Sequence, residues 1–156
     1  MIVAFIGHRD VDDAEPLAAR LTGIVVSLIR RGADTFLFGS GSAFDSLCLE
    51  TATVLKEKYR HIRRVYVRSS FESISVEYKD YLMTLYDETV FPQQVRHAGI
   101  SSYVKRNEAM IDMCDVLVTY FDSEYVPMRK RGRSGTALAV DYARKSGREI
   151  INVFER

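Results

Sequence analysis

The sequence contains no tryptophan, three prolines and only two cysteines among 156 residues. Cys48 and Cys114 stand singly within apolar segments, so we expect buried reduced thiols rather than a disulfide framework. His61 and His97 lack acidic or cysteine partners at ligand spacing, and HExxH and CxxC patterns are absent. We therefore expect no metal site and no bound cofactor. A serine hydrolase is not indicated either, because the GxSxG pattern is missing.

The chain also lacks an excess of charge and a long apolar run. Its formal net charge of +1 argues against a generally basic nucleic-acid binder. No apolar stretch approaches the roughly 20 residues of a membrane span, and residues 1–6 lack the basic start of a signal peptide. We expect a cytoplasmic protein without membrane contact. No repeat, low-complexity tract or linker divides the sequence, so we expect one domain over residues 1–156.

Short apolar segments alternate with amphipathic ones along the chain. This alternation predicts an α/β fold, a Rossmann-like three-layer sandwich with a mainly parallel sheet of order 3-2-1-4-5. In that order the winding reverses beside the first strand, so a ligand should bind at the carboxyl ends of the strands there. The predicted strands are 2–6, 35–38, 64–67, 116–121 and 150–154, with a short extended piece at 89–91. The predicted helices are 13–31 with an aspartate cap, 44–59, 71–86, 101–114 and 135–145.

A glycine- and serine-rich turn separates the predicted strand 35–38 from the helix that follows. Such a turn leaves uncommitted backbone N–H groups at a positive helix end, where a phosphate can bind. Asp45, one turn into the helix, contacts the ligand or only favours the helix dipole. A tight turn with a helix cap remains the alternative for the whole segment. The candidate binding residues of this first glycine turn are Gly39, Ser40, Gly41 and Ser42.

A second turn of the same kind opens the predicted helix 135–145. Ser134, Gly135 and Thr136 are its candidate ligand residues, with a simple helix cap as the alternative. The basic run Met128–Arg133 directly precedes this second glycine turn. It is interpreted as a phosphate-sensing lid, a small nucleic-acid patch or a solvated loop. Two such turns in one small domain suggest a nucleotide ligand.

Six further candidates fall at the same predicted edge of the sheet: Gly7, His8, Arg9, Arg106, Asn107 and Asp122. Gly7 lets the chain leave the first strand without a Cβ clash. His8 contacts the ligand or is a structural histidine. Arg106 suits phosphate or carboxylate recognition, with a surface ion pair to Glu108 as the alternative. Asp122 bonds a ribose hydroxyl or caps a turn.

The order of these motifs resembles the SLOG superfamily of Rossmann-like proteins, most closely its YpsA-like branch. The resemblance rests on Gly7-His8-Arg9, the first glycine turn, Lys105-Arg106-Asn107, Phe121-Asp122 and Ser134-Gly135-Thr136. It implies binding of a nucleotide or an ADP-ribose-like molecule at the carboxyl edge of the sheet. We expect a sensor or carrier rather than an enzyme.

Two more distant resemblances supply alternatives. LOG-type phosphoribohydrolases use an arginine, which Arg106 matches, and a glutamate, where this chain has Ala139. A nucleoside 5′-monophosphate phosphoribohydrolase would therefore need another carboxylate, from Asp45, Glu50 or Asp141. The DNA-processing protein A family binds single-stranded DNA, which would require the basic run and exposed tyrosines here. A homo-oligomer also stays open.

Overall fold

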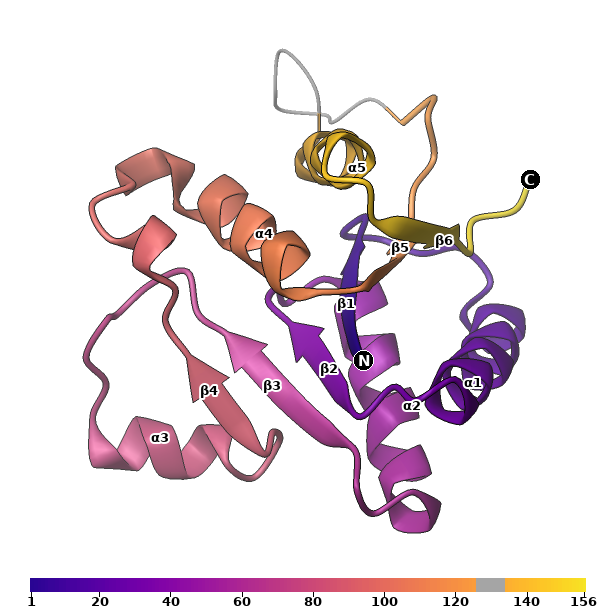
Figure 1. The fold of residues 1–156 in the computed structure, drawn as a ribbon, viewed down its shortest axis with the longest axis horizontal. Helices are drawn as coiled ribbons and strands as arrows, with labels where there is room; N and C mark the ends of the chain where they lie inside the picture. The colour runs from indigo at the N-terminus through magenta and orange to yellow at the C-terminus, as the bar shows by residue number, and fades with distance from the viewer. Residues whose placement is uncertain (126–133) are drawn as a thin grey trace.

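The computed structural model describes residues 1–125 and 134–156 (Figure 1). In this part of the chain, six parallel strands form one sheet of order β4-β3-β2-β1-β5-β6. The predicted α/β fold and the order of the five predicted strands are confirmed, and the sixth strand joins at the edge beside β3. The strands are β1 (Ile2–Gly7), β2 (Thr35–Phe38), β3 (Arg63–Val67), β4 (Glu88–Val90), β5 (Val116–Tyr120) and β6 (Glu149–Asn152).

Helices cover both faces of the sheet because its central strands are apolar on both sides (Figure 1). Val3 and Phe5 of β1 pack into the core under α1 (Ala14–Arg30) and α2 (Ala43–Lys58). Ala4 and Ile6 alternate to the other core, under α4 (Ser102–Met113) and α5 (Gly135–Lys145). Within the described residues, no helix is long and apolar enough to cross a lipid bilayer.

The predicted helix 71–86 is wrong. The helix in this region, α3, covers only Val76–Leu82, and Ser75 caps it by accepting a hydrogen bond from the Tyr78 N–H. The preceding residues are held in a loop because Arg68 donates hydrogen bonds to the carbonyl groups of Phe71 and Glu72. Phe71 has a φ of 60°, which is incompatible with a right-handed helix.

Three smaller expectations also need correction. The extended piece at 89–91 is the edge strand β4, one residue earlier than expected. The last strand ends at Asn152 rather than at residue 154. Asp13 stands at the N-cap of α1 with a φ of 47°, and its side chain makes no capping hydrogen bond. Short 3-10 helices, η1 (Gln93–Val95) and η2 (Gly99–Ser101), connect β4 to α4.

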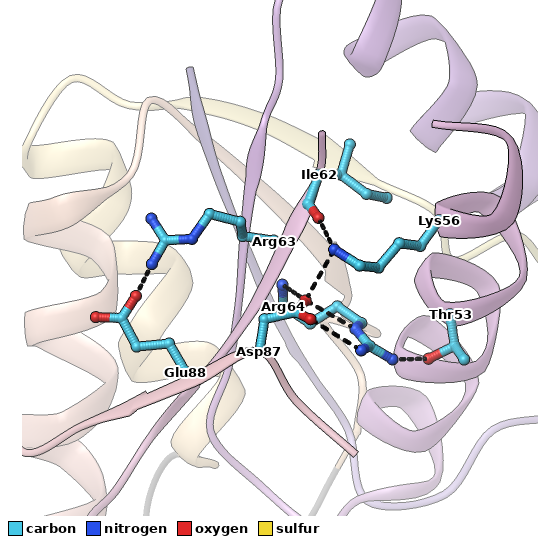
Figure 2. Close-up of polar contacts among 7 residues, drawn as sticks. All are labelled: Thr53, Lys56, Ile62, Arg63, Arg64, Asp87 and Glu88. Atoms are coloured by element: carbon cyan, nitrogen blue, oxygen red, sulfur yellow. Dashed lines mark hydrogen bonds and ion pairs between the residues drawn. The ribbon is translucent and has the colours of Figure 1, made fainter. Parts of the chain in front are cut away.

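A polar cluster fastens β3 and β4 to α2 at the amino ends of these strands (Figure 2). The backbone N–H and Nε of Arg64 donate to Oδ2 of Asp87 at 2.8 and 3.0 Å. Lys56 lies 3.4 Å from the same carboxylate, and Thr53 accepts from Arg64. These groups hydrogen-bond and pair with one another at the edge opposite the predicted ligand site, so their role is structural.

Candidate functional site

The first candidates, Gly7 and Arg9, connect the end of β1 to the start of α2. A Cβ atom on Gly7 would lie 2.3 Å from Cδ1 of Phe44, so the missing side chain lets α2 pack against β1. This confirms that Gly7 avoids a clash. The carbonyl of Arg9 accepts a hydrogen bond from the Ala43 N–H at 2.8 Å, whereas the residue itself is exposed. The start of α2 is therefore fixed by backbone contacts.

His8 and Asp122 join the carboxyl ends of β1 and β5. His8 is buried, and its Nε2 accepts a hydrogen bond from the Asp122 N–H at 2.9 Å. Burial lowers the pKa of His8, and an N–H donor to Nε2 requires the neutral ring. The Asp122 carboxylate accepts from the Glu124 N–H at 2.9 Å and pairs with Arg156. Both side chains thus hold the turn after β5.

The first glycine turn is filled by the protein's own carboxylate. Oδ2 of Asp45 accepts a hydrogen bond from the Ser40 N–H at 3.1 Å, and the side chain is 3% exposed. The Ser42 hydroxyl caps α2 by accepting from the Asp45 N–H at 3.0 Å. Ser40 in turn donates its hydroxyl to Ser42 at 3.0 Å. An anion from solution would therefore compete with Asp45 for this turn.

Arg106 reaches the same turn from the other face of the sheet. Its guanidinium donates to the carbonyl of Gly39, and its Nε donates to Oδ1 of Asn107 at 3.1 Å. A Cβ atom on Gly39 would lie 2.6 Å from Cδ of Arg106, so the glycine makes room for the arginine. The expected alternative for Arg106 is wrong, because it is 4% exposed and Glu108 pairs with Lys105 instead.

Asp45 and Arg106 influence each other's ionisation. Burial raises the pKa of Asp45 to about 7, although the N–H groups of Ser40 and Gly39 and the charge of Arg106 lower it. Burial also lowers the pKa of Arg106, and a guanidinium stays charged despite such a shift. Asp45 therefore changes its charge near neutral pH beside a permanent cation.

The second glycine turn differs from the first because no described carboxylate accepts a hydrogen bond from its backbone N–H groups. The Ser134 hydroxyl caps α5 by accepting from the Ala137 N–H at 3.0 Å. No described group accepts a hydrogen bond from the N–H of Gly135 or of Thr136. A Cβ atom on Gly135 would meet no atom of the described residues within 4 Å. A small pocket adjoins the turn, lined by Val104, Asn107, Glu108, Gly135, Leu138 and Ala139.

Thr119 is a candidate that the sequence analysis missed. It is fully buried near the end of β5, and its hydroxyl has no hydrogen-bond partner among the described residues. Strand alternation puts it on the same face as Leu117, which packs in the core under α4 and α5. It also pairs in register with Ile6 of that core. The available signal was an aliphatic hydroxyl in the otherwise apolar and aromatic segment 116–121.

The structure describes only some of the residues on which the enzyme and nucleic-acid alternatives depend. Glu50 is exposed on α2, while Ala139 is buried beside the second glycine turn. The basic run Met128–Arg133 lies outside the described residues. Among the residues that are described, no group of three His, Cys, Asp or Glu side chains could hold a metal ion.

No protein-family model matches the chain, and no curated protein matches it. The resemblance to the SLOG superfamily thus stays a prediction that rests on short motifs and their order.

Proposed function

We propose that the protein binds a nucleotide or an ADP-ribose-like molecule through a phosphate group at the amino end of α5. The observation that carries this proposal is the pair of N–H groups of Gly135 and Thr136, which no described acceptor uses. An 11-residue helix presents these donors at its positive end. No described atom would contact a Cβ on Gly135, which supports a close approach of a ligand to the backbone.

The surroundings of this turn support a ligand at the carboxyl edge. The order of the strands reverses between β1 and β5, and open α/β sheets bind ligands at such a point. Asn107 of α4 lines the same small pocket as Gly135, so a polar side chain from a second helix is available. Thr119 adds a buried hydroxyl on the face of the sheet that α5 covers.

A role as sensor or carrier fits this site better than glycosidic cleavage. Ala139, where a LOG-type enzyme would have its glutamate, lines the pocket. Glu108 lines the pocket too, but Lys105 lies 3.1 Å from its carboxylate. Cleavage of an N-glycosidic bond needs a carboxyl group free to assist the leaving base.

The test is a panel of nucleotides, including ADP-ribose, screened by thermal unfolding of the wild type and two variants. A ligand at about 100 times its Kd should stabilise the wild type by about 2.7 kcal/mol. Gly135→Val should abolish this gain, because the new side chain occupies the space for the phosphate. Gly23→Val in α1 also adds a side chain in open space and should keep the gain. Equal stabilisation of all three proteins would overturn the proposal.

A further inference from the structure

An apolar groove lies between α1 and the edge strand β6 (Figure 1). It has a volume of about 420 Å³, and the side chains of Ile24, Leu28 and Ile151 supply its apolar lining. Arg20 and Arg31 also line it, and each forms an ion pair with a glutamate. No residue of the candidate ligand site lines this groove. Exposed apolar surface bordered by charged groups is typical of a protein–protein contact.

The exposed face of α1 beside the groove carries no charge along most of its length. The exposed residues between Glu15 and Arg30 are Pro16, Ala19, Thr22, Gly23 and Ser27. Arg20 is only partly exposed, and its Nη2 donates to a backbone carbonyl at 2.9 Å. By contrast, α2 on the same face of the sheet exposes Glu50 and Lys58. A helix face in contact with water normally carries charged side chains, so this face of α1 indicates a partner.

One row of residues along α1 has a symmetric order of size and charge. The row with four-residue spacing consists of Glu15, Ala19, Gly23, Ser27 and Arg31. Its middle is occupied by three small residues, and opposite charges stand at its two ends, each about 12 Å along the axis from Gly23. All of the row except Glu15 lines the groove. Two antiparallel copies of this row bring Glu15 of each chain opposite Arg31 of the other.

The charges at both ends of the row are accessible to a partner. Glu15 and Arg30 form no ion pair with a described residue. The side chain of Arg31 is 46% exposed in its pair with Glu149. Such charges also suit the dipole of the helix itself. Their equal distance from an exposed glycine, however, makes this surface complementary to a second copy of itself, as a two-fold contact requires.

We propose that the exposed face of α1 and the adjoining groove form a self-association surface, on which α1 of a second copy packs antiparallel about a two-fold axis at Gly23. The small residues of the row let the two helix axes approach closely. The ends are held by Glu15 of each chain against Arg31 and Arg30 of the other. Two 17-residue helices offer less than the about 800 Å² per partner of a standard interface, so the dimer should dissociate on dilution. This proposal does not depend on the proposed ligand.

The first test is sedimentation velocity of the purified protein over concentrations from about 1 μM to about 1 mM. The wild type should show a monomer–dimer equilibrium. Gly23→Leu should weaken dimerisation at least tenfold, because its side chain fills the contact, while no described atom lies within 4 Å of a Cβ there. Gly41→Leu also adds a side chain in such a position and should dimerise like the wild type. A monomeric wild type, or unchanged dimerisation of Gly23→Leu, would overturn the proposal.

The second test exchanges the charges at the ends of the row. Glu15→Arg and Arg31→Glu should each weaken dimerisation at least tenfold, because each brings like charges together across the axis. An equimolar mixture of the two folded variants should form a heterodimer, since every end contact then joins opposite charges. The helix dipole predicts no such rescue. Glu149→Gln removes the same ion pair within the chain as Arg31→Glu and should dimerise like the wild type. A mixture that stays monomeric contradicts the antiparallel arrangement.

The third test locates the two-fold axis by disulfide cross-linking in a glutathione redox buffer. The native Cys48 and Cys114 are buried, so an added surface thiol is the accessible one. Residues on a two-fold axis face their own copies, and Gly23→Cys should therefore cross-link into a dimer on non-reducing electrophoresis. Ala19→Cys is the control, because its two copies would stand about 12 Å apart along the axes, too far for a disulfide. Equal cross-linking of both variants, or none in Gly23→Cys, would overturn the axis at Gly23.

Discussion

At the scale of single residues, the first glycine turn was predicted to bind an anion and is occupied by a carboxylate of the protein itself. Gly39 has no side chain, which allows Arg106 to cross over the end of β2 from α4. Asp45 then fills the turn from the α2 side and accepts a backbone hydrogen bond that a phosphate would otherwise receive. The sequence predicted these three residues as neighbours. It could not predict their mutual contacts, because those depend on two helices that pack on opposite faces of the sheet.

Gly39→Ala should destabilise the protein because its Cβ would lie 2.6 Å from Cδ of Arg106 and 2.7 Å from Sδ of Met110. Both neighbours are buried, so relief requires a shift of α4, and we expect a loss of about 1–3 kcal/mol. Urea unfolding measures it. Gly41→Ala, two residues away in open space, is the control and should unfold within about 0.5 kcal/mol of wild type. Equal stability of the two variants would mean that α4 shifts to accommodate the new side chain without a loss of free energy of unfolding.

At the scale of elements, the sequence predicted the strands that are apolar on both faces well. It predicted the short amphipathic helix α3 poorly. The strands β1, β2 and β5 are buried runs between helices, so their pattern leaves no other assignment. The region around α3 misled the analysis because Tyr81 and Leu85 stand at helical spacing and yet are exposed. A tertiary contact, the hydrogen bonds from Arg68, keeps residues 71 and 72 out of the helix.

The connection of α2, β3 and β4 should make stability depend on acid. Burial would raise the pKa of Asp87, but hydrogen bonds from Arg64 and the charges of Arg64 and Lys56 lower it to about 2. The contribution of the Asp87 carboxylate to the free energy of unfolding is therefore complete above its unfolded-state pKa of about 4. This contribution is lost as the pH falls toward 2. Allowing for solvent screening, Asp87→Asn should cost about 1–2 kcal/mol at pH 7 and little at pH 2.

Chemical denaturation at several pH values measures this difference. Asp80→Asn, on the exposed side of α3, is the matched control and should follow the wild type at every pH. If Asp87→Asn lowers the free energy of unfolding by the same amount at pH 2 as at pH 7, relative to the wild type, the side chain acts through packing and not through its charge.

At the scale of the whole molecule, the sheet order explains why distant motifs of the sequence converge. Gly7 ends β1, and Gly39 and Asp122 follow β2 and β5. These three strands are neighbours although more than 100 residues separate the end of β1 from β5. Parallel strands end at one edge, so the topology alone predicted this convergence. Which turn is filled by a described carboxylate could not be predicted, because Ser42 and Ser134 cap their helices in the same way and the contact of Asp45 with Ser40 depends on tertiary structure.

The positions of the carboxylates decide whether the carboxyl edge can cleave a glycosidic bond. The carboxylates that the sequence offered for a phosphoribohydrolase include Asp45, which is buried under the first glycine turn, and Glu50, which is exposed on α2. Ala139 leaves the LOG-type glutamate position without a carboxyl group. Incubation with adenosine monophosphate should therefore release little free adenine, because general acid assistance commonly contributes 10²–10⁴ in rate. Chromatography of the reaction mixture measures the release. Rapid release that Arg106→Gln abolishes, with Arg96→Gln as the unaffected control, would contradict the proposed sensor role and indicate an enzyme that uses the same edge of the sheet.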